Sequence, residues 1–189
     1  MHKNWNLLLV ENTYLESERI LLRPVTLEDA QAIFEYTSDE ETTRYLYDAH
    51  IDLEQTKRMI ANYYMKEPIG KYAMVLKETN KVIGTIEFRV DDWSEAGDLG
   101  FTMNRLYWGH GYMTEAANLI IQLAFEKLEL ARVFAGHEIA NEASGKVLLR
   151  IGMQLDGVLR KHEKIKGKLV DSMYYSILKE DYFSTKNNI

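Results

Sequence analysis

The stretch Tyr112–Lys127 constrains the fold more than any other part of the sequence. Its polar residues Glu115, Asn118, Gln122 and Glu126 recur at three- and four-residue spacing and form a single stripe, while the rest is largely apolar. A helix with one narrow polar stripe is buried on most of its surface. We therefore expect this segment to be a helix that packs under a sheet.

Runs typical of strands and of helices are mixed along the rest of the chain. Thr26 is a suitable N-cap for a helix from Leu27, and Gly152 is typical of a helix C-terminus. Helices are expected from residue 27, over 52–66 and over 142–151, and strands over 19–24, 72–76, 82–88, 97–103, 132–139, 155–160 and 170–178. Residues 77–81 and 164–168 have the composition of hairpin loops. This order predicts an α+β fold with a mixed, mainly antiparallel sheet flanked by helices, and neither a barrel nor a doubly wound fold.

The length of 189 residues and the mass of 22.0 kDa fit one domain. We expect a single domain over 1–189, with an N-terminal extension over 1–14 and a C-terminal tail over 183–189. The 23 Lys and Arg against 29 Asp and Glu give a net charge of −6. This charge argues against a general nucleic-acid binder, whose affinity depends on a basic surface.

Cysteine is absent, which excludes disulfides, thiolate zinc sites, iron–sulfur clusters and a cysteine nucleophile. The five histidines form no HxxxH or HExxH pair, so no metal site is expected. Near the N-terminus the only continuous apolar run is Leu7–Val10, which is too short for a signal peptide or a membrane span. These features predict a soluble, cytoplasmic protein without a membrane partner.

The most informative stretch lies where a predicted strand ends and the buried helix begins. Gly109 and Gly111 permit positive φ and a close approach of the backbone to a ligand, and the first helical turn offers unpaired N–H groups. A diphosphate suits such a place, and Arg105 and His110 can add positive charge. A tight strand-to-helix connection explains the same glycines, so the residues alone leave both interpretations open. The Walker and dinucleotide patterns are absent, since no Gly-Lys-Ser/Thr follows and Thr114 stands where a third glycine is needed.

Four segments stand out together: Glu18–Pro24 (ERILLRP), Lys81–Phe88 (KVIGTIEF), Trp108–Ala116 (WGHGYMTEA), and Asn141–Ser144 with the following Leu148 and Gly152-Met153. In this order and spacing they resemble the GNAT N-acetyltransferases, specifically the ribosomal-protein N-terminal acetyltransferase branch. They are similar to its opening strand, its central hairpin strand, its acetyl-CoA pyrophosphate loop and its second cofactor-contacting helix. The resemblance covers residues 15–180 and implies the GNAT acyl-CoA N-acyltransferase fold with acetyl-CoA as cofactor.

The resemblance also implies where acetyl-CoA binds. The pantetheine arm is expected along the fourth strand of the family, at Phe101, Thr102 and Met103, held by backbone groups like an extra β-strand. The diphosphate contacts are expected on the loop that leads into the helix: Gly109, His110, Gly111, Tyr112, Met113 and Thr114. Trp108 is a loop anchor or a platform for the base, and Asn141 is a helix cap, a pantetheine contact, or both. The family pattern has Gln or Arg where Leu106 stands here, so a side-chain contact to phosphate is missing at that position.

The implied reaction is direct attack of an amine on the thioester, and the usual proton donor to the leaving thiolate is missing. Many family members have a tyrosine where Leu148 stands here, and leucine cannot donate a proton. In the ribosomal-protein branch the serine of Asn-x-x-Ser takes this role, which points to Ser144; Ser144 could instead only support the first turn of its helix. The implied donor to the oxyanion is a backbone N–H near Thr102.

A general base must accept the proton of the amine. Glu87 is the first candidate, because it is expected on the strand beside the reactive one, from where a carboxylate can reach an amine. His137, Glu138 and Glu163 are lesser candidates. A carboxylate on a half-exposed strand face can equally be no more than solvated.

Together these features predict an acetyl-CoA-dependent N-acetyltransferase that acts on a primary amine, with a protein N-terminal amine as the favoured acceptor. A polyamine, an amino acid and an aminoglycoside-like compound are alternatives, and the acidic run Asp39–Glu41 agrees with a cationic acceptor. Because of Leu148, a non-catalytic acyl-CoA-binding module also stays open. The acceptor pocket is expected in residues 39–66 and 161–168, and the chain as a monomer or homodimer.

Overall fold

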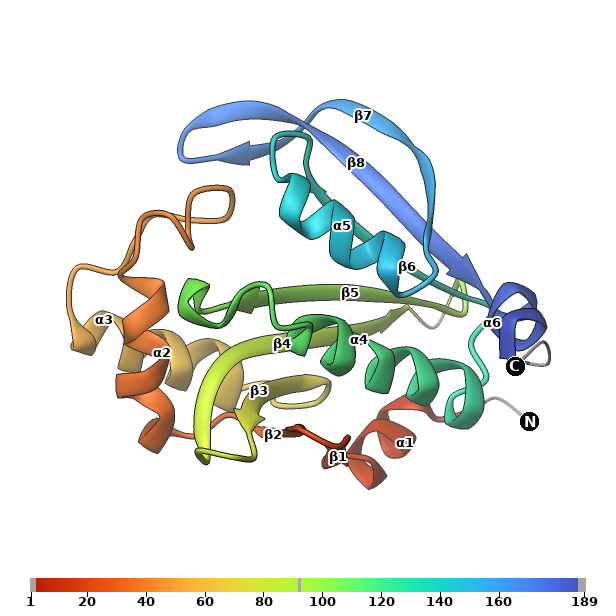
Figure 1. The fold of residues 1–189 in the computed structure, drawn as a ribbon, viewed down its shortest axis with the longest axis horizontal. Coiled ribbons are helices and arrows are strands. Elements are labelled where there is room, and N and C mark those ends of the chain that lie inside the picture. The colour runs from red at the N-terminus through yellow and green to blue at the C-terminus, as the bar shows by residue number, and fades with distance from the viewer. Residues whose placement is uncertain (1–2, 92, 187–189) are drawn as a thin grey trace.

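The structure, a computed structural model, describes residues 3–91 and 93–186, and its strands form one eight-stranded sheet (Figure 1). The strand order is β1-β2-β3-β4-β5-β6-β8-β7, and all neighbours pair antiparallel except β5 and β6. The strands are β1 (Leu15–Glu16), β2 (Ile20–Pro24), β3 (Lys71–Leu76), β4 (Lys81–Asp91), β5 (Ala96–Met103), β6 (Arg132–Glu138), β7 (Gln154–Ile165) and β8 (Lys168–Leu178). The prediction of an α+β fold with a mainly antiparallel sheet is confirmed.

Helices connect the strands and cover both faces of the sheet. The α-helices are α1 (Trp5–Glu11), α2 (Ala30–Thr37), α3 (Leu53–Met59), α4 (Tyr112–Gln122), α5 (Glu142–Arg150) and α6 (Lys179–Lys186). Two short 3₁₀ turns, η1 (Leu27–Asp29) and η3 (Arg105–Tyr107), precede α2 and α4. Two π-helical segments, η2 (Ile60–Met65) and η4 (Leu123–Lys127), continue α3 and α4, so the helices expected over 52–66 and 112–127 are both present.

The buried-helix prediction for residues 112–127 is confirmed. Ala116, Ala117 and Ile120 of α4 are fully buried, whereas Asn118 and Gln122 of the polar stripe are exposed. The helix lies across one face of the sheet beside α5, as Figure 1 shows, and we call this side the α4 face.

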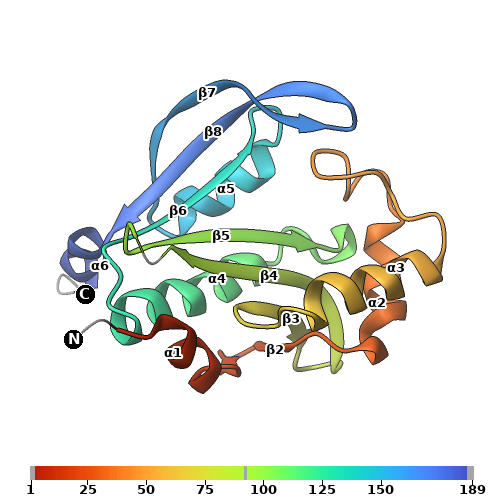
Figure 2. The ribbon, with the colours of Figure 1, turned by 180° about the vertical axis from the view of Figure 1, so that it is seen from behind.

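The opposite side, the α2 face, is partly covered by α2 and α3 (Figure 2). Side chains of β3 alternate between the two sides, because Met74 packs in the core under α4 while Ala73 and Val75 pack with Ile33 of α2. The sheet therefore has a hydrophobic core on each face.

The β7–β8 hairpin is longer than the sequence indicates. Its ladder continues to the pair Ile165↔Lys168, so the turn consists of Lys166 and Gly167 instead of the expected loop over 164–168. Both turn residues have positive φ, 47° and 78°, as in a two-residue type I′ turn, whose twist matches that of the flanking strands. Of the expected loop residues, Lys164, Ile165 and Lys168 are therefore paired as strand.

Both ends of the described chain belong to the packed structure. Trp5 and Leu9 of α1 lie in the core, and the Trp5 indole N–H donates to the Leu128 carbonyl at 3.1 Å. The N-terminal segment expected as an extension thus contributes to packing. At the other end α6 includes residues 183–186 of the expected tail, and residues 187–189 lie outside the described part.

Candidate functional site

The one parallel strand pair of the described sheet opens into a cleft. β5 and β6 pair over only three positions, from Ala96↔Arg132 to Asp98↔Phe134. Beyond these pairs the two strands diverge, and α5 follows β6 on the far side of the opening (Figure 1). The divergence leaves one edge of β5 without a strand partner from the Leu99 carbonyl to Met103.

The alternating direction of the backbone N–H and C=O groups along β5 shows which of them lie on that edge. The Ala131 N–H donates to the Glu95 carbonyl on the β6 side, while the Asn104 N–H donates to the Ile83 carbonyl on the β4 side. Successive residues of a strand point their backbone groups to opposite sides. Phe101 and Met103 therefore turn their N–H and C=O groups into the cleft, together with the Leu99 carbonyl, whereas the Leu99 N–H is used in the Asp98↔Phe134 pair and the groups of Thr102 are directed to β4. Unpaired backbone groups of this kind can bind an extended ligand.

A cavity of about 450 Å³ occupies the cleft. Ten of the residues singled out from the sequence line it: Phe101, Thr102, Met103, Trp108, Gly109, Gly111, Met113, Thr114, Asn141 and Ser144. It is also lined by Lys146 and Arg150, which the sequence did not indicate, and by four residues of the segment 39–66 in which the acceptor pocket is expected: Glu41, Thr42, Tyr45 and Leu46. Segments far apart in the chain thus meet around one pocket.

The glycine loop forms one end of this cavity. Gly109 and Gly111 have φ of 82° and 80°, and Gly111 is the N-cap of α4, where no side chain caps the helix. A Cβ on Gly109 would enter open space, with no atom within 4 Å. The N-terminal N–H groups of α4 consequently face an open hollow, which is suited to an anion.

Trp108 anchors this loop to the preceding strand. Its indole N–H donates to the Met103 carbonyl at 2.8 Å, as expected for a loop anchor, while its ring also lines the cavity. His110 does not line the cavity but an adjoining hollow that Arg19 and Arg150 share. The Tyr112 ring lies outside both, under the Arg19 guanidinium at 4.7 Å.

Arg19 fastens the loop to β2. Its guanidinium donates to the His110 carbonyl at 3.2 Å and to Glu115 Oε2 at 2.7 Å. Glu115 also accepts from the Ser17 hydroxyl and the Arg19 backbone N–H. Burial alone would raise the pKa of Glu115, but these hydrogen bonds and the charge of Arg19 outweigh it and lower this pKa. An ionised Glu115 therefore holds the loop through Arg19.

The start of α5 forms the opposite wall. The Asn141 side chain caps this helix by accepting from the Ser144 backbone N–H at 3.3 Å. The Ser144 hydroxyl has no hydrogen-bond partner among the described residues, so it does not serve as the cap. Leu148 is buried in the core at 1% exposure. Among Asn141, Ser144 and Leu148, therefore, only Ser144 has an unbonded hydroxyl at the cavity.

Glu87 lies on the α2 face rather than in the cavity. One carboxylate oxygen accepts from the Tyr63 hydroxyl and from Arg89, both at 2.6 Å, and the other accepts from Tyr64 at 3.3 Å. Its cross-strand neighbour is Gly100, and a Cβ added there would meet nothing within 4 Å. The missing side chain leaves an opening between Glu87 and the edge of β5.

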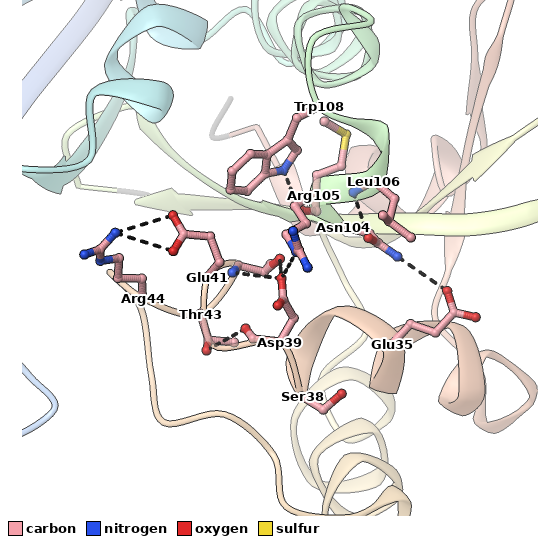
Figure 3. Close-up of polar contacts among 12 residues, drawn as sticks. Glu35, Ser38, Asp39, Glu41, Thr43, Arg44, Asn104, Arg105, Leu106 and Trp108 are labelled. Carbon is pink, nitrogen blue, oxygen red and sulfur yellow. Dashed lines mark hydrogen bonds and ion pairs between the residues drawn. The ribbon is translucent and has the colours of Figure 1, made fainter.

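The loop between α2 and α3, residues 38–52, closes the cavity on the side of the α2 face. Asp39 pairs with Arg105 at 2.8 Å, and the same Asp39 oxygen accepts from the Thr42 hydroxyl at 2.7 Å. Figure 3 shows Asp39 and Arg105 pointing toward each other from this loop and from η3. The loop that carries Glu41 and Tyr45 is therefore tied to the segment that leads into Gly109.

The Tyr47 side chain of the same loop lies near that of Thr102, and burial of the phenol raises the pKa of Tyr47 to about 12. Its phenol is therefore protonated at neutral pH. The sequence includes Tyr47 only in the broad segment 39–66 expected for the acceptor, since the loop has neither periodicity nor a motif, and the position of the Tyr47 side chain beside Thr102 connects it to the site.

The lesser base candidates are dispersed. His137 is buried beneath α5 at 8% exposure, with Nδ1 2.7 Å from the Glu138 carbonyl oxygen, and neither residue lines the cavity. Glu163 lies on β7, where its charge acts on Tyr174 and Asp98 of the α2 face.

Within residues 3–91 and 93–186, no three His, Asp or Glu side chains gather in a group that could hold a metal ion. No helix in this part of the chain has the length and apolar character to cross a membrane.

Comparison with known proteins agrees with this geometry. Residues 19–154 match the family described as acetyltransferase (GNAT) domain. An N-acetyltransferase of Bacillus licheniformis is 35% identical over 173 residues, which are 89% of this chain and 97% of the relative. The ribosomal-protein-serine acetyltransferase of Escherichia coli K12 is 26% identical over 126 residues, which are 65% of this chain and 70% of that protein. The crystal structure of a GNAT-family acetyltransferase from Bacillus anthracis superposes with a TM-score of 0.80 at 27% identity, over 88% of this chain and 99% of that one.

Proposed function

The chain belongs to the acetyltransferase (GNAT) family of acetyl-CoA-dependent N-acetyltransferases, and we propose that its acceptor is the N-terminal amine of a protein. The resemblance of four segments to the ribosomal-protein N-terminal branch supports a protein acceptor. So does the E. coli relative, which is named a ribosomal-protein-serine acetyltransferase.

The cleft fits acetyl-CoA. The edge of β5 offers the Leu99 carbonyl and the backbone groups of Phe101 and Met103 to the pantetheine arm, with the Met103 carbonyl already used by Trp108. The open hollow at Gly109 and the uncapped N-terminus of α4 suit the diphosphate. Acetyl-CoA, when bound, supplies the thioester that makes its acyl group transferable to an amine.

The acceptor is proposed to approach from the α2 face. Glu87 accepts the proton of its ammonium group through the opening at Gly100, and the Tyr63 and Arg89 hydrogen bonds hold this carboxylate in place. The free N–H groups of Phe101 and Met103 are the donors available to a carbonyl oxygen in the cleft. Ser144, on the opposite wall of the cavity, supplies the hydroxyl that donates to the sulfur of the leaving thiolate.

The unpaired edge of β5 beside the glycine loop is the observation that carries this function. It is tested with acetyl-CoA and a panel of peptides with free N-termini, spermidine, amino acids and an aminoglycoside, with thiol release and acceptor mass as readouts. We expect the peptides to be acetylated at the α-amine with the highest kcat/KM. A higher kcat/KM for a small amine would replace the proposed acceptor, and cofactor binding without any turnover would indicate a non-catalytic module.

Substitution of Ser144 tests the proton donor. Ser144→Ala is expected to lower kcat roughly 10- to 100-fold, because the variant lacks the hydroxyl that serves the leaving thiolate. The Kd for acetyl-CoA should be kept, since Asn141 still caps the Ser144 backbone N–H. Ser144→Thr retains a hydroxyl and is the matched control. An unchanged kcat in the alanine variant would remove Ser144 from the mechanism.

Substitution of Glu87 tests the base. Glu87→Gln is expected to lower kcat/KM for the peptide roughly 100-fold at neutral pH, with acetyl-CoA affinity unaltered. The deficit should narrow as pH rises, because more of the amine is then already uncharged. Glu78→Gln, in the exposed β3–β4 turn, is the control for loss of one negative charge. A deficit that stays constant across the pH profile would mean that Glu87 does not accept the proton.

A further inference from the structure

The outer part of the β7–β8 hairpin is basic, although the chain as a whole carries a net charge of −6. Residues 160–168, which we call the basic hairpin, contain a single carboxylate, Glu163, and these five cationic side chains: Arg160, Lys161, Lys164, Lys166 and Lys168. The rest of the chain is correspondingly more acidic.

The five cations lack ion-pair partners among the described residues, which is unusual for this chain. Of its 23 Lys and Arg, 18 lie outside the basic hairpin, and 12 of those 18 pair with Asp or Glu. Exposed cations elsewhere are thus mostly neutralised locally, whereas those of the hairpin are available to a partner.

The hairpin presents these charges on a defined backbone. Arg160, Lys161 and His162 bulge out of the ladder between the pairs Leu159↔Ser172 and Glu163↔Val170. Lys161 takes a φ of 50°, and its backbone N–H donates to Asp171 Oδ1 at 2.8 Å, which fixes the bulge. Bulges redirect side chains near functional sites. With the two-residue turn at its tip, the hairpin is a formed surface rather than a loose loop.

This surface borders the proposed acceptor entrance. The His162 ring packs edge-on to Tyr174 at 5.2 Å, and Tyr174 covers Gly136 of β6. Burial and the nearby charges of Glu163 and Asp98 raise the pKa of Tyr174, which connects the hairpin to the carboxylates of the α2 face. In Figures 1 and 2 the end of the hairpin projects toward the loop of residues 38–52. No residue of the basic hairpin lines the cavity or the adjoining hollow, so its charge is separate from the proposed cofactor site.

The proposed acceptor entrance therefore has a negatively charged inner part and a positively charged outer part. Its floor carries the carboxylates of Glu87 and Asp98, of which Arg89 neutralises only part, and its rim carries the basic hairpin. A peptide with a terminal ammonium group followed by acidic residues complements this order, because each of its charges meets the opposite sign.

We propose that the basic hairpin binds acidic side chains that follow the N-terminal amine of the acceptor protein. The proposal rests on the proposed function, and it specifies the charge of the acceptor segment. An RNA partner is disfavoured by the same layout, because the acidic floor and the net charge of −6 repel a polyphosphate chain.

The test compares three peptides that share their first three residues and continue with glutamate, glutamine or lysine. The wild-type protein is expected to acetylate the glutamate peptide with a kcat/KM about tenfold above that of the lysine peptide. High salt should reduce this ratio, because it screens the charges. In Arg160→Glu/Lys164→Glu/Lys168→Glu the order should invert, so that the lysine peptide is preferred. A gain for one peptide cannot result from misfolding.

The control variant Lys77→Glu/Lys127→Glu/Lys186→Glu changes three exposed lysines outside residues 39–66 and outside the hairpin; it has the same net charge as the hairpin variant, and it should keep the wild-type order. Both variants should acetylate the bare tripeptide amide as the wild type does. Equal kcat/KM for all three peptides would overturn the hairpin proposal while leaving the proposed function in place. If spermidine is acetylated and no peptide is, the proposed function fails and this inference with it. Binding of single-stranded RNA that only the hairpin variant loses, with equal peptide kinetics, would reassign the surface to RNA.

Discussion

Gly109→Asp is expected to weaken acetyl-CoA binding by at least about 100-fold, because it places a carboxylate where the diphosphate is proposed to lie. A Cβ at this position enters open space at the N-terminus of α4, so the new side chain is accommodated on the ligand side of the loop. Like charges a few ångströms apart at a protein surface repel by about 3 kcal/mol, which corresponds to about 100-fold in Kd. The Kd is measured by isothermal titration calorimetry.

Gly109→Asn is the matched control for this variant. Asn and Asp are nearly identical in shape, and both tolerate the left-handed conformation better than other residues, which the φ of 82° requires. Asn should weaken binding by less than about tenfold, through the cost of filling the hollow and of backbone adjustment. If the two variants weaken binding equally, charge at Gly109 has no influence and the diphosphate does not lie there.

Asp29→Asn is expected to lower the free energy of unfolding by about 3 kcal/mol at neutral pH, since it breaks a mostly buried ion pair. Asp29 is 5% exposed and receives two hydrogen bonds from the Arg23 guanidinium, at 2.7 and 2.8 Å. The Thr26 backbone N–H also donates to it at 2.8 Å, which caps the 3₁₀ turn η1 that leads into α2. Urea denaturation of both proteins measures the difference. Asp48→Asn, at an exposed carboxylate, is the control and should be neutral.

The same substitution should remove part of the acid sensitivity of the fold. Burial alone would raise the pKa of Asp29, but the hydrogen bonds from Arg23 and Thr26 and the charge of Arg23 outweigh it, so this pKa is lowered below its ordinary value. The unfolded chain then binds the proton more readily, and the contribution of Asp29 is complete above its ordinary pKa and is lost as pH falls through the folded value. The difference in unfolding free energy between the two proteins should therefore shrink at low pH. A difference that is independent of pH would contradict this account.

The sequence predicted the segments whose structure depends on near neighbours. The polar stripe of residues 112–127 fixed α4 and its burial, and the glycines at 109 and 111 marked a loop that does adopt positive φ. The sequence predicted the position of the hairpin turn at 164–168 but overestimated its length. A type I′ turn at Lys166-Gly167 allows the strands to pair up to the turn itself. α1 and α6 were not predicted. Each is a short helix, and the burial of Trp5 depends on contacts with residues more than a hundred positions away.

In the candidate site, too, the residues in local motifs were predictable from the sequence, and those placed by long-range contacts were not. Ten predicted residues around the cavity come from motifs that the sequence contains as continuous segments. Glu87 was proposed from its place on a strand, but its hydrogen bonds to Tyr63 and Arg89 depend on how η2 packs on the sheet. Glu41 and Tyr45 lie in the segment 39–66 expected for the acceptor, but no motif places their side chains at this cavity, because their position is set by the ion pair between Asp39 and Arg105, 66 positions apart.

By itself, the sequence determined which segments are helix, strand and glycine loop, since periodicity and backbone conformation depend on residues a few positions apart. It also determined the charge imbalance of residues 160–168. Only the tertiary structure decided that β5 and β6 part after three pairs, that Gly100 leaves an opening beside Glu87, and that the basic hairpin borders this entrance. These features arise where distant segments meet, and no local pattern encodes the spacing between them.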